Sequence, residues 1–316
     1  MSRNVPSRSP HKSARIVPAA VDQRRAQGRF QTRYPNHRIA VIGAGTMGRS
    51  IATGMVRTGA IAAERIAVTD IDTAAARAVA HDLGVVVATD SATACASATV
   101  VVICVMPHDV LNILAELVSC GAFASKPLLI SVAAKITTPA IEEVVGDRAP
   151  VIRAMPNTPC AIGHGMTVLA KGCTATAAHL AVASELFSTL GRCMTLAERH
   201  LDAVTALSAS GPAFIYLVLE ALADGGVRCG LSRDIATELA AQMTLGAAEM
   251  VLSTGRHPAA LRDDVTTPGG CTIAGLLALE DGRLRSVLAR AIEETTRSLA
   301  GDSRQGMRTG PSLKAE

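Results

Sequence analysis

A glycine-rich turn near the start of the chain constrains the fold more than any other feature. The turn reads Gly-Ala-Gly-Thr-Met-Gly at residues 43–48, between an apolar run at 38–42 and a helical pattern that continues to about residue 57. A second apolar run, residues 65–69, ends at Asp70. In such a unit the first glycine makes the turn, the second lets a diphosphate approach, and the third lets helix and sheet pack closely. The short motif alone would be weak, but its setting predicts a parallel α/β domain that binds a dinucleotide.

Residues of this unit are the first candidates for cofactor binding. A carboxylate at the end of the second strand, here Asp70, accepts a hydrogen bond from a ribose 2′-hydroxyl and repels a 2′-phosphate. The next two residues, Ile71 and Asp72, supply no Arg or Lys. Asp70 therefore favours a dinucleotide without a 2′-phosphate. The candidates are Gly43, Gly45, Thr46, Met47, Gly48 and Asp70.

The alternation of strands and helices continues after this unit. Apolar runs predict strands at residues 85–87, 99–105, 128–132, 151–154, 166–170 and 193–196, with a helix near 175–190. Loops at the carboxyl ends of parallel strands line the cleft in which a cofactor lies. Two of these strand ends add five cofactor-binding candidates, which are Met106, Pro107, Ala133, Ala134 and Lys135.

Composition and charge exclude several classes of protein. Hydrophobic residues make up 49% of the chain and aromatic residues 2%, so the core must consist of Ala, Val, Leu and Ile, which suits parallel sheets and close-packed helices. The net charge of +4 is local, because residues 1–38 hold nine basic residues and one acid. The remainder is slightly acidic, which argues against a nucleic-acid-binding surface. We expect no run long and apolar enough to span a bilayer, since the nearest, residues 213–219, stops at Glu220.

The eight cysteines are scattered and form no C-x-x-C pair. This pattern fits a reduced, cytoplasmic protein better than a disulfide framework or a zinc site, so we expect no metal.

The chain divides into four predicted segments. Residues 1–36 have no apolar period and are predicted to be a disordered basic tail, with a transit peptide as the alternative. Residues 37–197 form the predicted dinucleotide-binding Rossmann domain. Strand patterns then end, and residues 198–301 are predicted to form a helical substrate and dimerisation domain. Residues 302–316 are predicted to be a flexible tail.

The helices of the second domain are apolar on several faces. A helical period at residues 201–208 is followed by Ser-Gly-Pro at 210–212, a predicted break that starts a new helix. Residues 213–227 and 235–252 are rich in Ala and apolar on nearly all sides. Such helices need burial by more than their own domain, which predicts a homodimer; the alternative is a monomer with a tight helical bundle.

The stretch from residue 265 to 279 reads as an ordered loop that runs into a helix. Thr266 and Thr267 bring hydroxyls, while Gly269 and Gly270 let the backbone approach a ligand closely. Thr272 is the predicted N-cap of the helix. Free backbone N–H groups at such a helix start can hold a small carboxylate, although a capped turn between two helices is the alternative.

Several segments together resemble one enzyme family. IGAGTMGRSIATG, SVAAKI, RAMPNTP, DAVTALSASGPAFIYLVLEALADGGVRCGL, AAQMTLGAAEMVLSTGRHPAALRDDVTTPGGCTIAGLLALE and LARAIEETTRS are similar to pyrroline-5-carboxylate reductase, from about residue 38 to 298. The resemblance implies an α/β Rossmann-type N-terminal domain followed by an all-α C-terminal dimerisation domain, often assembled into larger rings. It also implies reduction of 1-pyrroline-5-carboxylate to L-proline with NADPH or NADH, of which Asp70 favours NADH.

The resemblance also assigns roles to residues of the loop. Backbone N–H groups of Gly269, Gly270 and Cys271 would hold the substrate carboxylate. The Thr272 hydroxyl would donate to the ring nitrogen, with Thr267 and Thr266 as second contacts. Asn157, in the loop at 155–159, would line the nicotinamide side, although a turn Asn between two prolines is the alternative. Loop and glycine turn should then face each other across the two ligands.

Three positions depart from the family pattern. Met106-Pro107 replaces the usual Lys-Pro, Ala133-Ala134-Lys135 replaces Ala-Ala-Gly, and Ala209 replaces a glycine. We hypothesise that Lys135 supplies the positive charge that is lost at Met106. Another cyclic imine acid as substrate is the alternative for these departures, and a catalytically silent nucleotide-sensing dimer is a third interpretation. A β-hydroxyacid dehydrogenase shares the two-domain plan but uses a Lys on the helix that enters the second domain. This class is excluded because no Lys lies between residues 171 and 314.

Overall fold

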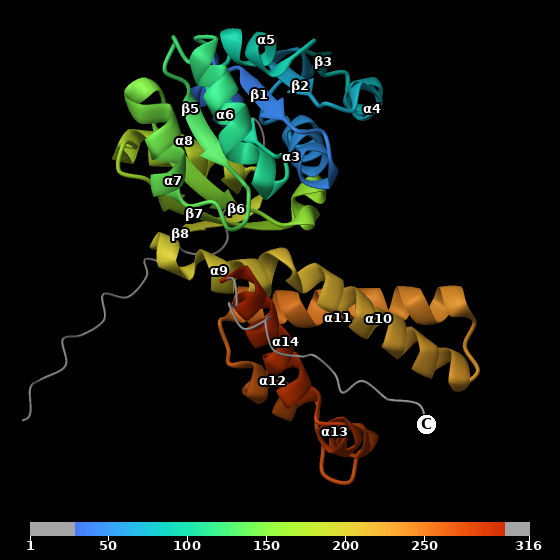
Figure 1. Cartoon of the computed structure of the whole chain (residues 1–316). Helices are drawn as coiled ribbons and strands as arrows, with labels where there is room; N and C mark the ends of the chain where they lie inside the picture. Colours follow the sequence, from blue (N-terminus) through green and yellow to red (C-terminus); the bar gives the residue numbers. More distant parts are fainter. Residues whose placement is uncertain (1–28, 301–316) are drawn as a thin grey trace, which may run out of the picture.

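The computed structural model describes residues 29–300, which form an α/β domain and an extended group of helices (Figure 1). The α/β part ends with strand β8 (Gly191–Thr195), and the helical domain follows from residue 198. The predicted fold class is therefore confirmed. The tail predicted at 302–316, and residues 1–28 of the tail predicted at the other end, lie outside the described residues.

A single sheet organises the α/β domain. Within the described residues its eight strands follow the order β3-β2-β1-β4-β5-β6-β7-β8, and only the β6–β7 pair is antiparallel. The central strands are buried along their whole length, as parallel strands covered on both faces should be. The strands before β8 are β1 (Ile39–Ile42), β2 (Ile66–Thr69), β3 (Val86–Val87), β4 (Val100–Ile103), β5 (Leu128–Ser131), β6 (Val151–Met155) and β7 (Gly165–Lys171).

Helices cover both faces of the sheet and give two separate cores. Helices α3 (Thr46–Arg57), α4 (Thr73–Leu83) and α8 (Ala177–Ser188) pack on one face. Helices α5 (Ser91–Ala96), α6 (Val110–Ser119) and α7 (Thr138–Val145) pack on the other. Short 3₁₀ turns complete this domain at Ala63–Arg65, Pro107–Asp109, Gly146–Arg148 and Thr158–Ile162. The three-layer arrangement brings the carboxyl ends of the parallel strands to one edge, where the glycine turn lies.

Residues 29–36 are ordered, so the prediction of a disordered tail is wrong for this segment. Helix α2 (Arg29–Arg33) places Phe30 in the core at 1% exposure. The ring of Tyr34 lies 4.8 Å from that of Phe30. A helix of five residues is too short to show a period in the sequence, so only packing of its single Phe identifies it.

The helical domain begins with the 3₁₀ turn η5 (Glu198–His200) and α9 (Leu201–Val204). A π-helical turn, η6 (Thr205–Ala209), then leads directly into α10 (Gly211–Arg228). The new helix predicted at residues 210–212 is therefore confirmed, although Ser210 keeps a right-handed helical backbone and no loop separates α10 from the π-helical turn. The wide turn is closed by Ser210, whose N–H donates to the Thr205 carbonyl at 2.9 Å. Pro212 falls in the first turn of α10, where its missing N–H costs little.

Helices α10 and α11 (Arg233–Thr254) form a long hairpin, and α12 (Pro258–Asp264), α13 (Cys271–Asp281) and α14 (Leu284–Leu299) follow (Figure 1). Among the described residues of α10 to α14, only Ala223, Ala236 and Ala240 are buried. The large apolar side chains of these helices are mostly exposed, which leaves the domain without a core of its own.

One helical stretch of the described residues, 198–228, is long and apolar enough to cross a membrane by length and composition alone. The prediction that no run qualifies is therefore wrong on this measure, because the charges at Glu220 and Asp224 do not end the stretch. Only 11% of its most apolar window is buried. A helix that packs against a partner subunit has the same composition.

Candidate active site

The three glycines of the turn differ in what surrounds them. Gly43 has φ +103°, and a Cβ there would lie 2.8 Å from the carbonyl carbon of Cys104 on the neighbouring strand end. A Cβ on Gly48 would lie 1.8 Å from the Gly43 oxygen, so only glycine allows helix and turn to pack. At Gly45, by contrast, no described atom lies within 4 Å of the added carbon. Gly45 therefore opens a cradle that a ligand can enter.

Helix α3 begins at this cradle with a free end. Its N-cap is Gly45, and no side chain among the described residues caps it. The N–H groups of Thr46 and Met47 therefore start a helix whose positive dipole end faces the open space. Open space beside an uncapped helix start is what a dinucleotide diphosphate requires, so the residues present fit this group.

Asp70 is held in place by the glycine turn. Its Oδ2 accepts from the N–H of Ala44 at 2.6 Å, and its Oδ1 accepts from the N–H of Asp72 at 2.9 Å. Asp72 in turn caps α4 by accepting from Ala74 at 2.9 Å. The side chain of Ile71 is fully exposed. A fixed carboxylate with spare lone pairs stands where the ribose of a dinucleotide would lie.

The two strand ends beside the turn hold the remaining cofactor candidates. Met106, just before Pro107, exposes 62% of its surface. Ala133 is buried, and its N–H donates to the Ser131 hydroxyl at 3.4 Å, with Ala134 next to it. Lys135 is exposed and has φ +68°, a backbone conformation that glycine adopts more easily. Its ammonium group forms no ion pair with any described residue, so its charge is available to a ligand.

Asn157 connects the two domains. Its Oδ1 accepts from the N–H of Met166 at 2.9 Å, and its Nδ2 donates to the carbonyl of Ser208 at 3.2 Å. Ser208 lies in the π-helical turn, which leaves backbone carbonyls without their usual helical donors. The side chain therefore has a structural role whether or not it also lines a nicotinamide.

The loop before α13 is tightly folded. The N–H of Gly270 donates to the Thr267 carbonyl at 3.0 Å, and Gly269 has φ +71°. The Thr266 hydroxyl donates to the Arg262 carbonyl at 2.8 Å, so this hydroxyl can only accept from a ligand. The hydroxyl of Thr267 makes no hydrogen bond within residues 29–300, and it lies close to Gly270, where a Cβ would come within 2.5 Å of its Oγ1.

Thr272 is not the N-cap of α13, so that prediction is wrong. Gly270 takes the N-cap position with an extended backbone, and the helix begins at Cys271. Thr272 is instead half-buried in the first turn, and its hydroxyl has no partner in the described part of the chain. Because no described side chain caps α13, the first N–H groups of the helix are free to bind an anion.

The glycine turn and this loop do not meet within one chain. Figure 1 shows α13 at the end of the helical domain that is remote from the sheet, whereas α3 lies in the opposite part of the molecule. The expectation that the two would face each other is therefore wrong for a single copy. A cavity of about 220 Å³ also lies elsewhere, since residues from the amino ends of β1 and β2, such as Arg38 and Arg65, line it.

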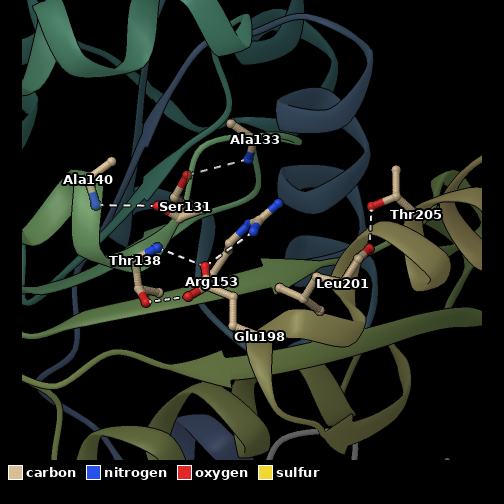
Figure 2. A network of polar contacts seen from close by, with 9 residues as sticks. Ser131, Ala133, Thr138, Ala140, Arg153, Glu198, Leu201 and Thr205 are labelled. Atoms are coloured by element: carbon tan, nitrogen blue, oxygen red, sulfur yellow. Dashed lines mark hydrogen bonds and ion pairs between the residues drawn. The ribbon is translucent and has the colours of Figure 1, made fainter. Parts of the chain in front are cut away.

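A buried ion pair at the junction of the domains was missed by reasoning from sequence. Arg153 on β6 pairs with Glu198 at 3.2 Å (Figure 2). A charged residue inside the apolar run Val-Ile-Arg-Ala-Met was the available signal, because a buried charge requires a partner. Nothing in the sequence indicates which acid that partner is. Within residues 29–300, no group of three or more His, Cys, Asp or Glu is arranged to hold a metal ion.

The fold and these helix starts define a two-domain, dinucleotide-dependent oxidoreductase. A family model described as pyrroline-5-carboxylate reductase dimerisation matches residues 198–301. A second model, described as NADP oxidoreductase coenzyme F420-dependent, matches residues 38–135. The chain belongs to the pyrroline-5-carboxylate reductase family.

Named pyrroline-5-carboxylate reductases are similar over most of the chain. The protein from Glycine max is 40% identical over 257 residues, which cover 81% of this chain and 93% of that protein. The one from Arabidopsis thaliana is 43% identical over 81% of this chain and 91% of its own length. Among solved structures, the reductase of Coxiella burnetii has a TM-score of 0.74 at 33% identity, covering 84% of this chain and 98% of that one.

A crystal structure of the Plasmodium falciparum enzyme with NADP bound has a TM-score of 0.76 at 26% identity, over 84% of this chain and 97% of that one. The predicted family and the predicted class of cofactor, NADPH or NADH, are therefore confirmed.

Proposed function

We propose that this protein reduces 1-pyrroline-5-carboxylate to L-proline with NADPH or NADH, in the cytoplasm. The observation that carries the proposal is the intact loop at residues 266–272, which leads into an uncapped helix start in a chain whose Gly45 cradle fits a dinucleotide. The relatives named pyrroline-5-carboxylate reductase support it over about four fifths of the chain. A catalytically silent nucleotide-sensing dimer would have no need of this loop.

Two copies of the chain complete the site. The loop lies far from the sheet of its own chain (Figure 1), and the apolar faces of α10 and α11 are exposed. Since these faces need a partner, a homodimer or a larger homo-oligomer buries them through the helical domain. The loop of one copy can then approach the strand ends of another, so that the substrate lies between two subunits.

The residues of the loop position and polarise the imine. Free N–H groups at Cys271 and Thr272, in the first turn of α13, hold the substrate carboxylate, because the N–H of Gly270 already donates to the Thr267 carbonyl. The Thr272 hydroxyl donates a hydrogen bond to the ring nitrogen and stabilises the negative charge that develops there as the imine carbon accepts the hydride, while a proton from solvent completes the amine. Thr267, whose hydroxyl is also without a described partner, is the second donor, and Thr266 accepts. A donor of this kind contributes roughly 100-fold or more in rate.

The bound nicotinamide supplies the hydride, and the protein supplies alignment. The turn at residues 43–48 holds the diphosphate, and Asn157 and the strand ends at 106–107 and 133–135 hold the nicotinamide half. Asp70, fixed by the N–H of Ala44 at 2.6 Å, accepts from a ribose hydroxyl and favours NADH. Turnover measured with NADH and with NADPH tests this preference; a higher kcat/KM with NADPH would contradict it.

Lys135 replaces the charge that the family usually places before Pro107. Its ammonium group is exposed at the neighbouring strand end. Because its φ of +68° suits glycine, Lys135→Gly removes the charge without straining the backbone. We expect this variant to raise the KM for the cofactor or lower turnover, while the folded protein is at least as stable. Unchanged kinetic constants would show that the charge has no role.

A different cyclic imine acid is the second candidate substrate. The specific observation in its favour is Met106, an exposed apolar side chain where the family usually has Lys. A panel of five- and six-membered imine acids, followed by the absorbance of the reduced cofactor, separates the two. The proposal expects the highest kcat/KM with pyrroline-5-carboxylate, and oxidation of the cofactor with none of the imines would support the silent dimer instead.

A further inference from the structure

The junction between the two domains contains a buried polar network that the reaction does not use. Arg153 lies on β6 of the Rossmann domain, and its Nη1 donates to Glu198 Oε1 at 3.2 Å (Figure 2). Glu198 is the first residue of η5, where the chain enters the helical domain. Its carboxylate also accepts from the N–H of Thr138 at 2.7 Å and from the Thr138 hydroxyl at 2.6 Å. Sheet, α7 and the start of the helical domain thus meet at one carboxylate.

The Arg153 end of the network is buried, which makes its charge costly. The Arg153 side chain is 3% exposed and that of Glu198 22%. Nε and Nη2 of Arg153 have no hydrogen-bond partner among the described residues, so the guanidinium is held through one nitrogen only. Buried ion pairs of this kind often add no stability over a well-packed apolar pair. The ion pair is therefore better explained by the orientation that it gives the two domains than by a gain in folding stability.

Other contacts at the same junction make it stiff. Asn157 donates to the Ser208 carbonyl at 3.2 Å, about two turns of helix beyond η5. Leu201 of α9 is fully buried in a small apolar cluster with Met155, Val168 and Ala170 of the sheet. Polar contacts on either side of an apolar cluster restrict both tilt and rotation of the first helical turns.

A small change in the tilt of the helices at this junction causes a larger displacement at the far end of the helical domain. Helix α10 has 18 residues, so at 1.5 Å per residue it is about 27 Å long, and a tilt of about 5° at its base moves its far end by about 2 Å. Misplacing reacting groups by about 1 Å costs as much as 100-fold in rate. The orientation of the helical domain at β6 therefore determines whether loop and cofactor meet productively.

We infer that Arg153 and Glu198 are positioning residues, which lock the helical domain against the sheet at the angle that hydride transfer requires. The inference rests on the proposed function for its kinetic consequence only, because the angle itself can be measured without turnover. Arg153 acts through Glu198 and the backbone of α9, and it touches neither substrate nor cofactor.

The test compares Arg153→Met, Arg153→Lys and Glu198→Gln with a control, Lys126→Met. The control removes a cation from an ion pair of the same domain, with Asp147 at 3.5 Å, that is exposed and away from the junction. For Arg153→Met we expect kcat to fall at least about tenfold, with an increased isotope effect from deuterated cofactor, while the cofactor Kd stays within about twofold. Since only one nitrogen makes the contact, Arg153→Lys should recover most of the rate, and the control should resemble the wild type.

A wild-type kcat and isotope effect in a dimeric Arg153→Met protein would overturn the inference. So would a loss of cofactor binding in proportion to the loss of rate, because this would indicate damage to the Rossmann domain alone. Where Arg153→Met does not fold, Glu198→Gln decides in the same way, since it keeps the shape and one acceptor oxygen.

A distance measurement separates this inference from the proposed function. Spin labels at the exposed Cys173 and Cys229, with Cys120 and Cys271 replaced by Ser, report the distance between the domains. We expect a narrow distribution in the wild type and a broader or shifted one in Arg153→Met, whatever the substrate proves to be. Identical distance distributions would overturn the positioning role of Arg153 even if the enzyme reduces pyrroline carboxylate. A broadened distribution would support this role even if another imine is the substrate.

Discussion

The two domains use similar apolar residues in opposite ways. In the described part of the Rossmann domain, five large apolar side chains are exposed, whereas the helical domain exposes twenty over fewer residues. The parallel sheet is covered on both faces by helices from its own crossovers, so each strand finds its partners within the chain. Helices α10 and α11 pack mainly against each other, although each is apolar on several sides, so most of their apolar surface has no partner within the described residues. The first domain is therefore complete by itself, whereas the second, in the proposed homo-oligomer, is part of a core that another copy completes.

The largest expected effect comes from placing a charge on the unpartnered face. Leu239 of α11 is 56% exposed in one chain, and Val86 of the edge strand β3 is 48% exposed. If a partner buries Leu239, then Leu239→Asp should dissociate the oligomer and abolish activity, because a buried unpaired charge is very costly. Val86→Asp should leave both unchanged. Sedimentation velocity with activity assays checks this, and equal behaviour of the two variants would remove the contrast between the domains.

The next effect concerns the helix start that the helical domain contributes. Thr272→Val keeps the shape of the side chain and removes its hydroxyl, so we expect kcat to fall about 100-fold without loss of the oligomer. Thr272→Ser should stay within about tenfold of the wild type, since the donor is kept. Steady-state kinetics with a saturating cofactor measures both. A Val variant as active as the Ser variant would rule out the hydroxyl as the donor to the ring nitrogen.

A smaller effect distinguishes two glycines of the Rossmann domain. The space at Gly45 is open, so Gly45→Val should fold normally and raise the KM for the cofactor about tenfold by filling the cradle. Gly48→Ala should instead prevent folding, because its Cβ would lie 1.8 Å from the Gly43 oxygen. Circular dichroism and cofactor titration separate the two results. Normal cofactor binding by a folded Gly45→Val protein would place the diphosphate elsewhere.

The smallest effect appears only at alkaline pH and belongs to the self-contained core. Burial raises the pKa of Cys95, Cys160 and Cys193 from 9.0 to about 12 in the folded protein. Between these values the unfolded chain loses thiol protons that the folded chain keeps, so stability should fall as pH rises above 9. Thermal unfolding at rising pH measures the slope, and Cys160→Ala should make it shallower. A slope unaffected by this substitution would exclude a contribution from that thiol.

Much of the fold follows from short patterns in the chain. The strand at 128–132, for example, is β5 with one residue fewer, and the turn at 43–48 joins a strand to a helix as predicted. These features depend on contiguous residues, since a buried parallel strand is apolar throughout and a glycine turn is limited by local sterics. The same reasoning identified the loop before α13 but misplaced its N-cap, because Gly270 and Thr272 are both suitable residues and only the backbone conformation decides between them.

By itself, the sequence determined the order of the two domains, the dinucleotide turn and the residues of the loop that carry the proposed chemistry. The tertiary structure alone decided that Phe30 belongs to the core, that Arg153 pairs with Glu198, and that the loop lies away from the glycine turn of its own chain. The physical reason is sequence distance. Local patterns reflect forces between neighbouring residues, whereas these three features depend on the angle at which separately folded segments come together in space.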